Sequence, residues 1–197
     1  RVILIKLADR AHNMETLEFI PPDKQKRVAL ETMEIYAPLA SRLGISAIKT
    51  KLENLAFPYL YPKEYQWLKD NVEKRRQEAR KYIDRARENL KDSLKKEGIE
   101  VVEIKARLKS YFSLYRKLLR YDMDFDRIHD LAAWRVVVKD VKTCYETLGS
   151  IHQHWRPLPG RIKDSIAFPK ANAYQSLHTT VICEEGRIIE VQIRTPE

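Results

Sequence analysis

The sequence predicts an α+β protein, helical in its first half and built on a mixed β-sheet flanked by helices in its second half. Between residues 23 and 97, apolar side chains recur every three or four positions, which is the period of an amphipathic helix. After Gly98 the pattern changes to alternation and short β-branched runs, which are typical of strands. With 197 residues, 44% of them hydrophobic, the chain can bury a core.

The N-terminal part of this pattern predicts a helical hairpin. Its first helix runs from Asp23, a possible N-cap, to Leu43 before Gly44, and Pro38 should kink it. The apolar face of this helix comprises Val28, Thr32, Ile35, Leu39 and Leu43. The second helix presents Ile48, Leu52, Leu55 and Ala56. It should stop before Pro58, because a residue that precedes proline disfavours the α conformation.

One long amphipathic helix, or two helices end to end, is predicted over residues 62–97. Although the segment is highly charged, its apolar residues keep helical spacing: Leu68, Val72, Ala79, Ile83, Ala86, Leu90 and Leu94. Gly98 should end the helix. The basic run that begins at Lys74 could contact nucleic acid, but acidic residues lie between the cations, and a solvated helix surface explains it better.

Strands and helices alternate in the rest of the chain. The spacing predicts strands at 101–109, 134–138, 178–183 and 188–195, and helices at 111–120 and 141–155. The last two strands are joined by a tight turn at Glu184–Gly186.

The charge balance indicates anionic partners. The chain has 37 Lys and Arg residues against 28 Asp and Glu residues, for a net charge of +9, so phosphates on nucleotides, RNA or a lipid surface are expected. Its two cysteines have no CxxC spacing, which predicts neither a disulfide framework nor a zinc site and suits the reducing cytoplasm. No apolar run approaches the roughly 18 residues of a membrane span. Because the sequence begins with Arg1 inside an apolar run, we expect it to be a piece of a longer protein.

Two carboxylates are candidates for a metal site. In the last strand, alternation places Glu190, Gln192 and Arg194 on one face, although a solvent-facing strand explains that pattern equally well. Asp130 precedes a buried strand, where an unsatisfied carboxylate would be costly, but it could also be a cap. If Asp130 and Glu190 meet, they form the oxygen-rich half of a Mg²⁺ site whose other ligands are substrate phosphates.

The loop between residues 159 and 175 is the second candidate for a binding site. It offers cations, amides and one aromatic ring: Arg161, Lys163, Lys170, Asn172, Tyr174 and Gln175. His178 follows and could donate to a phosphate, whereas His152 and His154 fall in a predicted helix and are interpreted as structural. The loop lacks GxxxxGK[ST] spacing, which argues against an ordinary P-loop, and a generic basic surface loop is an alternative.

Five ordered segments together resemble the RelA/SpoT homologue family, the stringent-response enzymes that make and hydrolyse guanosine tetra- and pentaphosphate. The segments are RLKSYFSLYRK (107–117), DLAAWRV (130–136), PGRIKD (159–164), NAYQSLHTT (172–180) and EVQIRT (190–195). The resemblance implies a nucleotidyltransferase-like synthetase domain over residues 61–197, led by the helix at 62–97. Residues 1–60 would be the end of an HD-type hydrolase domain and its linking bundle.

The resemblance also implies a role for each matching residue. Asp130 and Glu190 would hold Mg²⁺, and Glu190 could take the proton from the acceptor's 3′-hydroxyl. Arg107 and Arg135 would clamp the adenine of ATP, while Tyr174 would stack on guanine. The phosphates on the ATP side would be neutralised by Lys109 and Lys117. Those on the guanine-nucleotide side would be neutralised by Lys170 and His178, and the catalytic Lys163 would also neutralise phosphate charge. Asn172, Gln175 and Gln192 would complete the guanine-nucleotide site.

The N-terminal motif KLADRAHNM (6–14) is similar to the closing helix of the family's hydrolase domain. Asp9 would match a metal ligand and Asn13 a nucleotide contact. The other ligands of the catalytic Mn²⁺ have no counterpart in this chain, so no hydrolase activity is expected. The sequence also departs from the family at Ser165, often Tyr, and at Ala173, often Gly.

The resulting expectation is a cytoplasmic GTP/GDP pyrophosphokinase that moves the β,γ-pyrophosphate of ATP to the 3′-hydroxyl of GTP or GDP with Mg²⁺. The alternative is a fragment that binds nucleotide or RNA without turnover. Ribosome or RNA contacts would come from regulatory domains outside this chain, no membrane partner is expected, and the oligomeric state is left open.

Overall fold

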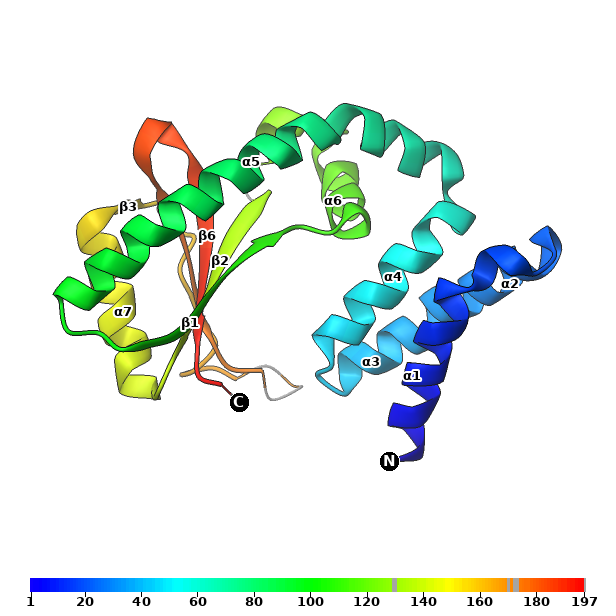
Figure 1. The fold of residues 1–197 in the computed structure, drawn as a ribbon, viewed down its shortest axis with the longest axis horizontal. Helices are drawn as coiled ribbons and strands as arrows, with labels where there is room; N and C mark the ends of the chain where they lie inside the picture. The colour runs from blue at the N-terminus through cyan, green and yellow to red at the C-terminus, as the bar shows by residue number, and fades with distance from the viewer. Residues whose placement is uncertain (129–130, 170, 172–173, 197) are drawn as a thin grey trace. The chain divides into compact units, whose positions relative to one another are not determined.

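The computed structural model describes residues 1–128, 131–169, 171 and 174–196, and Figure 1 shows its ribbon. The chain forms two compact units. Unit 1 consists of Arg1–Glu73 and Ser110–Arg120, and unit 2 consists of Lys74–Lys109 and Tyr121–Glu197. The boundary between residues 60 and 61 that the family resemblance implies stays a prediction.

Unit 1 is helical. Its helices are α1 (Val2–Glu15), α2 (Pro22–Glu31), α3 (Ala37–Arg42), α4 (Ser46–Leu60), the beginning of α5 (Pro62–Lys96) and α6 (Tyr111–Leu118), with single 3₁₀ turns at Leu17–Phe19 and Leu119–Tyr121. Its core joins the apolar faces of α1 to α4, including Leu7, Met14, Leu17, Ala29 and Leu52. The predicted helix at 111–120 is confirmed, with its last residues in the 3₁₀ turn.

The predicted helix at 23–43 is interrupted by a π-helical segment, Thr32–Tyr36. A π turn inserts an additional residue into the helix, so the face that is buried changes. As a result Ile35 is 56% exposed and Leu43 is 46% exposed, contrary to the predicted face. The helix begins at Pro22 rather than with an Asp23 cap, because proline suits the first helical position.

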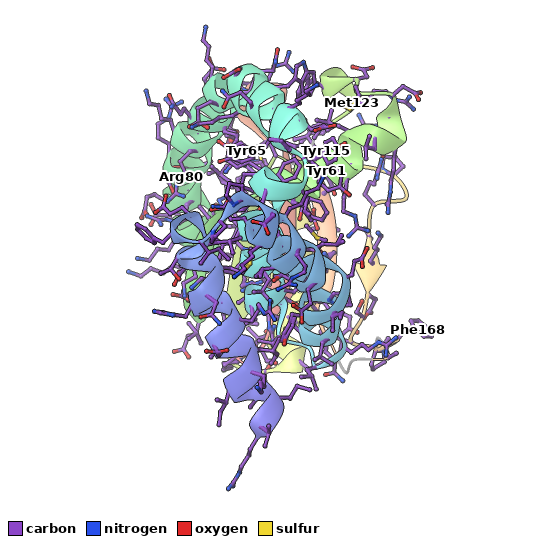
Figure 2. The ribbon with its side chains drawn as sticks, turned by 90° about the vertical axis from the view of Figure 1, so that its right-hand side faces the viewer. Tyr61, Tyr65, Arg80, Tyr115, Met123 and Phe168 are labelled. Atoms are coloured by element: carbon purple, nitrogen blue, oxygen red, sulfur yellow. The ribbon has the colours of Figure 1, made fainter. Side chains whose placement is uncertain are left out.

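The prediction that the second helix stops before Pro58 is wrong, because α4 continues through this proline to Leu60. Aromatic packing around the fully buried Phe57 holds the last turn in place. The Phe57 ring stacks on Tyr115 with centroids 5.1 Å apart, and it meets Tyr65 edge-on at 5.6 Å. Figure 2 shows Tyr61, Tyr65 and Tyr115 gathered at this place in unit 1.

Unit 2 contains one mixed sheet. Its strands are β1 (Val101–Leu108), β2 (Ala132–Val138), β3 (Arg156–Pro157), β4 (Lys163–Asp164), β5 (Leu177–Ile182) and β6 (Ile188–Arg194). The order is β1-β2-β6-β5-β3, and β4 also pairs with β5. Strands β2 and β6 run parallel, and the other pairs are antiparallel. The α+β prediction is confirmed, while the short strands β3 and β4 were not predicted.

Helices α5 and α7 (Val141–His154) cover one face of this sheet. As predicted, α5 is one continuous helix, and its apolar stripe enters the core with Ile83, Leu90 and Leu94. The indole of Trp134 on β2 lies in the same core and donates a hydrogen bond of 3.2 Å to the Ile83 carbonyl. The helices therefore leave the opposite face of the sheet for polar side chains.

Candidate active site

The strand register gathers polar side chains from five strands on one face of the sheet. Paired residues on neighbouring strands share a face, so the ladders define rows across the sheet. One row consists of Lys163, His178, Gln192, Arg135 and Lys105. The next row consists of Thr180, Glu190, Ala133 and Arg107. The predicted alternation of β6 is confirmed, because Ile189, Val191 and Ile193 are buried on the other face.

A chain of hydrogen bonds links the first row to Glu190. Arg135 Nε donates to Gln192 Oε1 over 2.8 Å, and the Gln192 amide donates to the Tyr174 hydroxyl. That hydroxyl lies 3.0 Å from His178 Nε2, and His178 Nδ1 lies 3.0 Å from Glu190 Oε1. The network fixes the guanidinium and the imidazole and therefore orients the Glu190 carboxylate.

The site has an excess of positive charge. Burial lowers the pKa of the half-buried Arg135, and the nearby charge of Arg107 lowers it further, while the phenol of Tyr174 acts in the opposite direction. Arg194 also lowers this pKa. Cations held together in this way favour an anionic ligand. Between Arg107 and Glu190 in the second row lies Ala133, which contributes only a methyl group.

Asp164 shapes the loop that carries Lys163. Its Oδ1 accepts hydrogen bonds from the backbone N–H groups of Ile166 (2.9 Å) and Ala167 (2.8 Å), and its Oδ2 accepts from the Tyr145 hydroxyl at 2.8 Å. Burial raises the pKa of Asp164, but these hydrogen bonds to the carboxylate outweigh it, and the pKa is lowered. The turn after Lys163 is thus tied to α7, and Lys163 stays opposite His178.

Two protein families match the chain. Residues 106–197 match the family described as "Region found in RelA / SpoT proteins", and residues 1–46 match the family described as "HD domain". Over its whole length the chain is 49% identical to the GTP pyrophosphokinase of Myxococcus xanthus and 48% identical to the bifunctional (p)ppGpp synthase/hydrolase SpoT of Escherichia coli K12. The chain therefore contains a RelA/SpoT region at residues 106–197 and part of an HD domain at residues 1–46. The chain spans 26% and 28% of the length of these two relatives.

Solved structures agree with the fold of a RelA/SpoT synthetase domain. The small alarmone synthetase 2 of Bacillus subtilis is 26% identical, with a TM-score of 0.53 over 64% of this chain and 73% of that one. The small alarmone synthetase 1 of the same organism, bound to its product pppGpp, is 19% identical with a TM-score of 0.50 over 66% of this chain and 74% of that one. The second likeness concerns the fold alone.

Several residues that the RelA/SpoT resemblance singles out are not brought together by the structure. Asp130, Lys170 and Asn172 lie outside the described residues, so their predicted roles stay predictions. Lys117 belongs to unit 1 with α6, whereas Lys109 directly follows β1 in unit 2. The backbone N–H of Lys109 donates to the Leu131 carbonyl at 2.9 Å, which ties the end of β1 to the residue before β2.

The predicted Mg²⁺ site is only half described. Glu190 supplies a carboxylate of the type that Mg²⁺ binds, with a side chain that is 31% exposed. Within the described part of the chain, no three His, Cys, Asp or Glu residues cluster as a metal site. The pairing of Glu190 with Asp130 therefore remains a prediction. Gln175 is exposed beside Tyr174.

The residues of the hydrolase motif lie on α1 in unit 1. The amide of Asn13 donates to the Asp9 carboxylate over 3.3 Å, and both residues are exposed. One helix therefore presents both predicted hydrolase residues side by side, as expected for residues four apart.

Other predictions concern residues outside the polar face of the sheet. The imidazole of His152 lies 2.8 Å from the Thr179 hydroxyl, and burial lowers its pKa, which fits a structural role. Cys144 and Cys183 are free and buried, and burial raises the pKa of the two thiols to about 11 and about 12. Across the described ranges, no helix has the length and apolarity that crossing a membrane requires.

Sequence reasoning missed two positioning residues. Tyr145 is 42% exposed on α7, and nothing in its helical pattern indicates a contact with the loop. Asp164 follows Lys163 in the PGRIKD motif. An Asp in a loop often accepts hydrogen bonds from the backbone N–H groups two and three residues later, here Ile166 and Ala167, so an Asx turn could have been predicted. Phe168 in the same loop is 80% exposed and extends from the ribbon in Figure 2.

Proposed function

We propose that unit 2 carries a GTP/GDP pyrophosphokinase, which transfers the β,γ-pyrophosphate of ATP to the 3′-hydroxyl of GTP or GDP. The observation that carries this proposal is the cationic face of the sheet, which Arg107, Arg135 and Lys163 share with one oriented carboxylate, Glu190. The match of residues 106–197 to the RelA/SpoT region and the 49% identity to a relative named GTP pyrophosphokinase support it. The products are pppGpp or ppGpp, the signals of the stringent response, and AMP.

The reaction needs a base, an oriented donor and charge compensation. The 3′-oxygen attacks the β-phosphorus of ATP, the bond from that phosphorus to the α,β-bridging oxygen breaks, and AMP leaves with the bond electrons. Glu190 receives the proton of the 3′-hydroxyl, because it is a carboxylate on this face and its contact with His178 holds it in place. Lys163, opposite His178, lies where it can compensate phosphate charge.

Substrate orientation is assigned to planar side chains on the same face. Arg107 and Arg135 lie in adjacent rows of adjacent strands, and a guanidinium stacks on a purine as an ammonium does not. The plane of Arg135 is fixed by its bond to Gln192. Tyr174, whose hydroxyl is bound by Gln192 and His178, would turn its ring toward guanine. Gln175, Lys170 and Asn172 would complete that side.

We further propose that Asp130 and Glu190 hold Mg²⁺. When bound, the ion would neutralise charge on the β- and γ-phosphates of ATP. The carboxylate of Glu190 is a suitable ligand, and Asp130 stands in the sequence two residues before β2, the parallel neighbour of β6. In the same proposal, Lys109 and Lys117 neutralise phosphate charge on the ATP side. The protein is assigned to the cytoplasm, a reducing compartment that suits its two free thiols.

Turnover can be distinguished from binding alone by product analysis. The chain is incubated with ATP, GTP and Mg²⁺, and AMP and pppGpp are measured by ion-exchange chromatography. The proposal expects both products in equal amounts. The net charge of +9 favours a second candidate, a module that binds nucleotide or RNA without turnover. That candidate predicts no AMP and an affinity for RNA that falls steeply with salt.

A further inference from the structure

A cavity lies within unit 1 and takes no part in the proposed reaction. Its volume is about 490 Å³, within the range of about 300–1,000 Å³ that is usual for ligand sites. The π-helical segment, α3, α4 and α6 supply its lining: Met33, Pro38, Ser41, Arg42, Lys49, Glu53, Phe112 and Arg116. All of these residues belong to unit 1, and none has a role in the synthetase site.

Two cations of this cavity lie near one nearly buried carboxylate, and a third cation lines the same cavity. The Glu53 side chain is 8% exposed, with Lys49 Nζ at 3.6 Å and an Arg116 terminal nitrogen at 3.9 Å from its Oε1. Both separations exceed hydrogen-bond length, so the two cations keep donors for another acceptor. Within the described parts of the chain, the third cation, Arg42, has no ion-pair partner. Because one cation suffices to neutralise Glu53, the cavity has two positive charges in excess.

Helix stability accounts for only part of this arrangement. Arg42 and Arg116 stand in the last turns of α3 and α6, where a cation interacts favourably with the helix dipole. That effect explains a cation at each helix end. It does not explain why both side chains and Lys49 line one cavity, beside the apolar Met33 and the nearly buried Phe112.

We propose that this cavity binds a molecule with a diphosphate group, whose charge is met by Arg42, Lys49 and Arg116. Guanidinium groups bind phosphate oxygens in pairs, and an ammonium adds a point charge, so the set suits two adjacent phosphates. Met33, Pro38 and Phe112 form the apolar part of the lining, which would take a nucleoside. The proposal does not rest on the synthetase function, because it involves other residues in the other unit.

Methionine methyl NMR tests this proposal directly. The sequence has three methionines, of which Met33 lines the cavity, Met14 lies in the core of unit 1, and Met123 lies in unit 2. Inorganic pyrophosphate or GDP is titrated into the labelled chain without Mg²⁺. We expect a saturable shift of the Met33 methyl signal that exceeds any shift of Met14. An unchanged Met33 signal with both probes would overturn the proposal, whatever the enzymatic activity of the chain.

Matched variants separate a built site from general charge attraction. Arg42→Ala and Arg116→Ala should each weaken pyrophosphate binding at Met33 by at least about tenfold, because each removes a charged phosphate donor. Arg27→Ala, an exposed arginine of α2 outside the cavity, makes the same charge change and should leave the affinity unchanged. The unshifted Met14 signal shows that each variant is folded. Equal losses in all three variants would contradict the proposal.

Comparison of the two probes identifies the source of the diphosphate. Tighter binding of GDP than of pyrophosphate assigns the cavity to a nucleotide that also contacts Met33 and Phe112. Equal affinities assign it to the free diphosphate. Both results support the diphosphate site, whereas binding of AMP as tight as that of GDP would contradict it.

Discussion

The two faces of the sheet in unit 2 are made by the same strands and carry opposite kinds of side chains. On β6, Ile189, Val191 and Ile193 are buried under α5 and α7. The residues between them, with Gln192 at the centre, are partly exposed and belong to the polar network. Neighbours along one strand lie on different faces. Substitutions one residue apart should therefore affect either the free energy of unfolding or the enzymatic activity, but not both.

The largest expected effect on the polar face comes from Glu190→Gln. Loss of the carboxylate removes the proposed base and metal ligand, so the rate of AMP formation should fall by about 10³-fold or more, or about 4 kcal/mol of transition-state stabilisation. The free energy of unfolding should change little, as measured by urea titration. The control is Glu146→Gln, an exposed residue of α7 that pairs with Lys142 over 3.5 Å. A variant with near-normal turnover would remove Glu190 from the mechanism.

On the opposite face, Ile193→Ala should act on stability. Ile193 is fully buried and pairs with Leu177 on β5 and Val136 on β2, so truncation leaves a cavity in the core. We expect a loss of about 2–5 kcal/mol in the free energy of unfolding. At a temperature where the variant is folded, its Michaelis constants for ATP and GTP should be close to those of the parent. If stability did not change, the assignment of this face to the core would be wrong.

An intermediate effect is expected for Gln192→Ala, next to Ile193 in the strand. The variant loses the amide that holds Arg135 and Tyr174, so both substrates should bind less well, and the ratio of kcat to KM should fall by about tenfold. Stability should be nearly unchanged, because Gln192 is partly exposed. Thermal unfolding provides the comparison with Ile193→Ala. A large drop in melting temperature with normal kinetics would reverse the distinction between the faces.

The smallest effect concerns the pH dependence of Asp164. Its pKa in the folded chain is lowered, so the stability it contributes is present above its unfolded pKa of about 3.9 and is lost as the pH falls through the folded value. Asp164→Asn should therefore be less stable than the parent at neutral pH. The difference in unfolding free energy should shrink below about pH 4. A difference that stays constant with pH would exclude the carboxylate as the cause.

Helices and strands with a regular pattern of apolar residues, and one face in the core, were predictable from the sequence. The helix α5 keeps its apolar stripe over 35 residues, and alternation fixes which side chains of β6 are buried. The candidate face followed from this alternation and from the family motifs. Glu190, Gln192, Arg135 and His178 indeed meet in one network.

Elements that depend on distant contacts were not predictable. The π turn at Thr32–Tyr36 shifts a helical face by one residue, which no local pattern indicates. The helix α4 passes Pro58 because aromatic residues from other helices pack on Phe57. Strand β4 exists only through its pairing with β5, and the contact of Asp164 with Tyr145 joins positions 19 residues apart. In each case tertiary packing decides the local structure.

The most direct test of the central claim is the fate of the ATP phosphates at the polar face. The chain is incubated with GDP, Mg²⁺ and ATP radiolabelled at the β-phosphorus, and the labelled nucleotides are separated by chromatography. Transfer by in-line attack on the β-phosphorus predicts that the label appears in the 3′-diphosphate of ppGpp, and that Arg135→Ala reduces this product. Label that remains in ADP, or in ATP without AMP formation, would contradict the account.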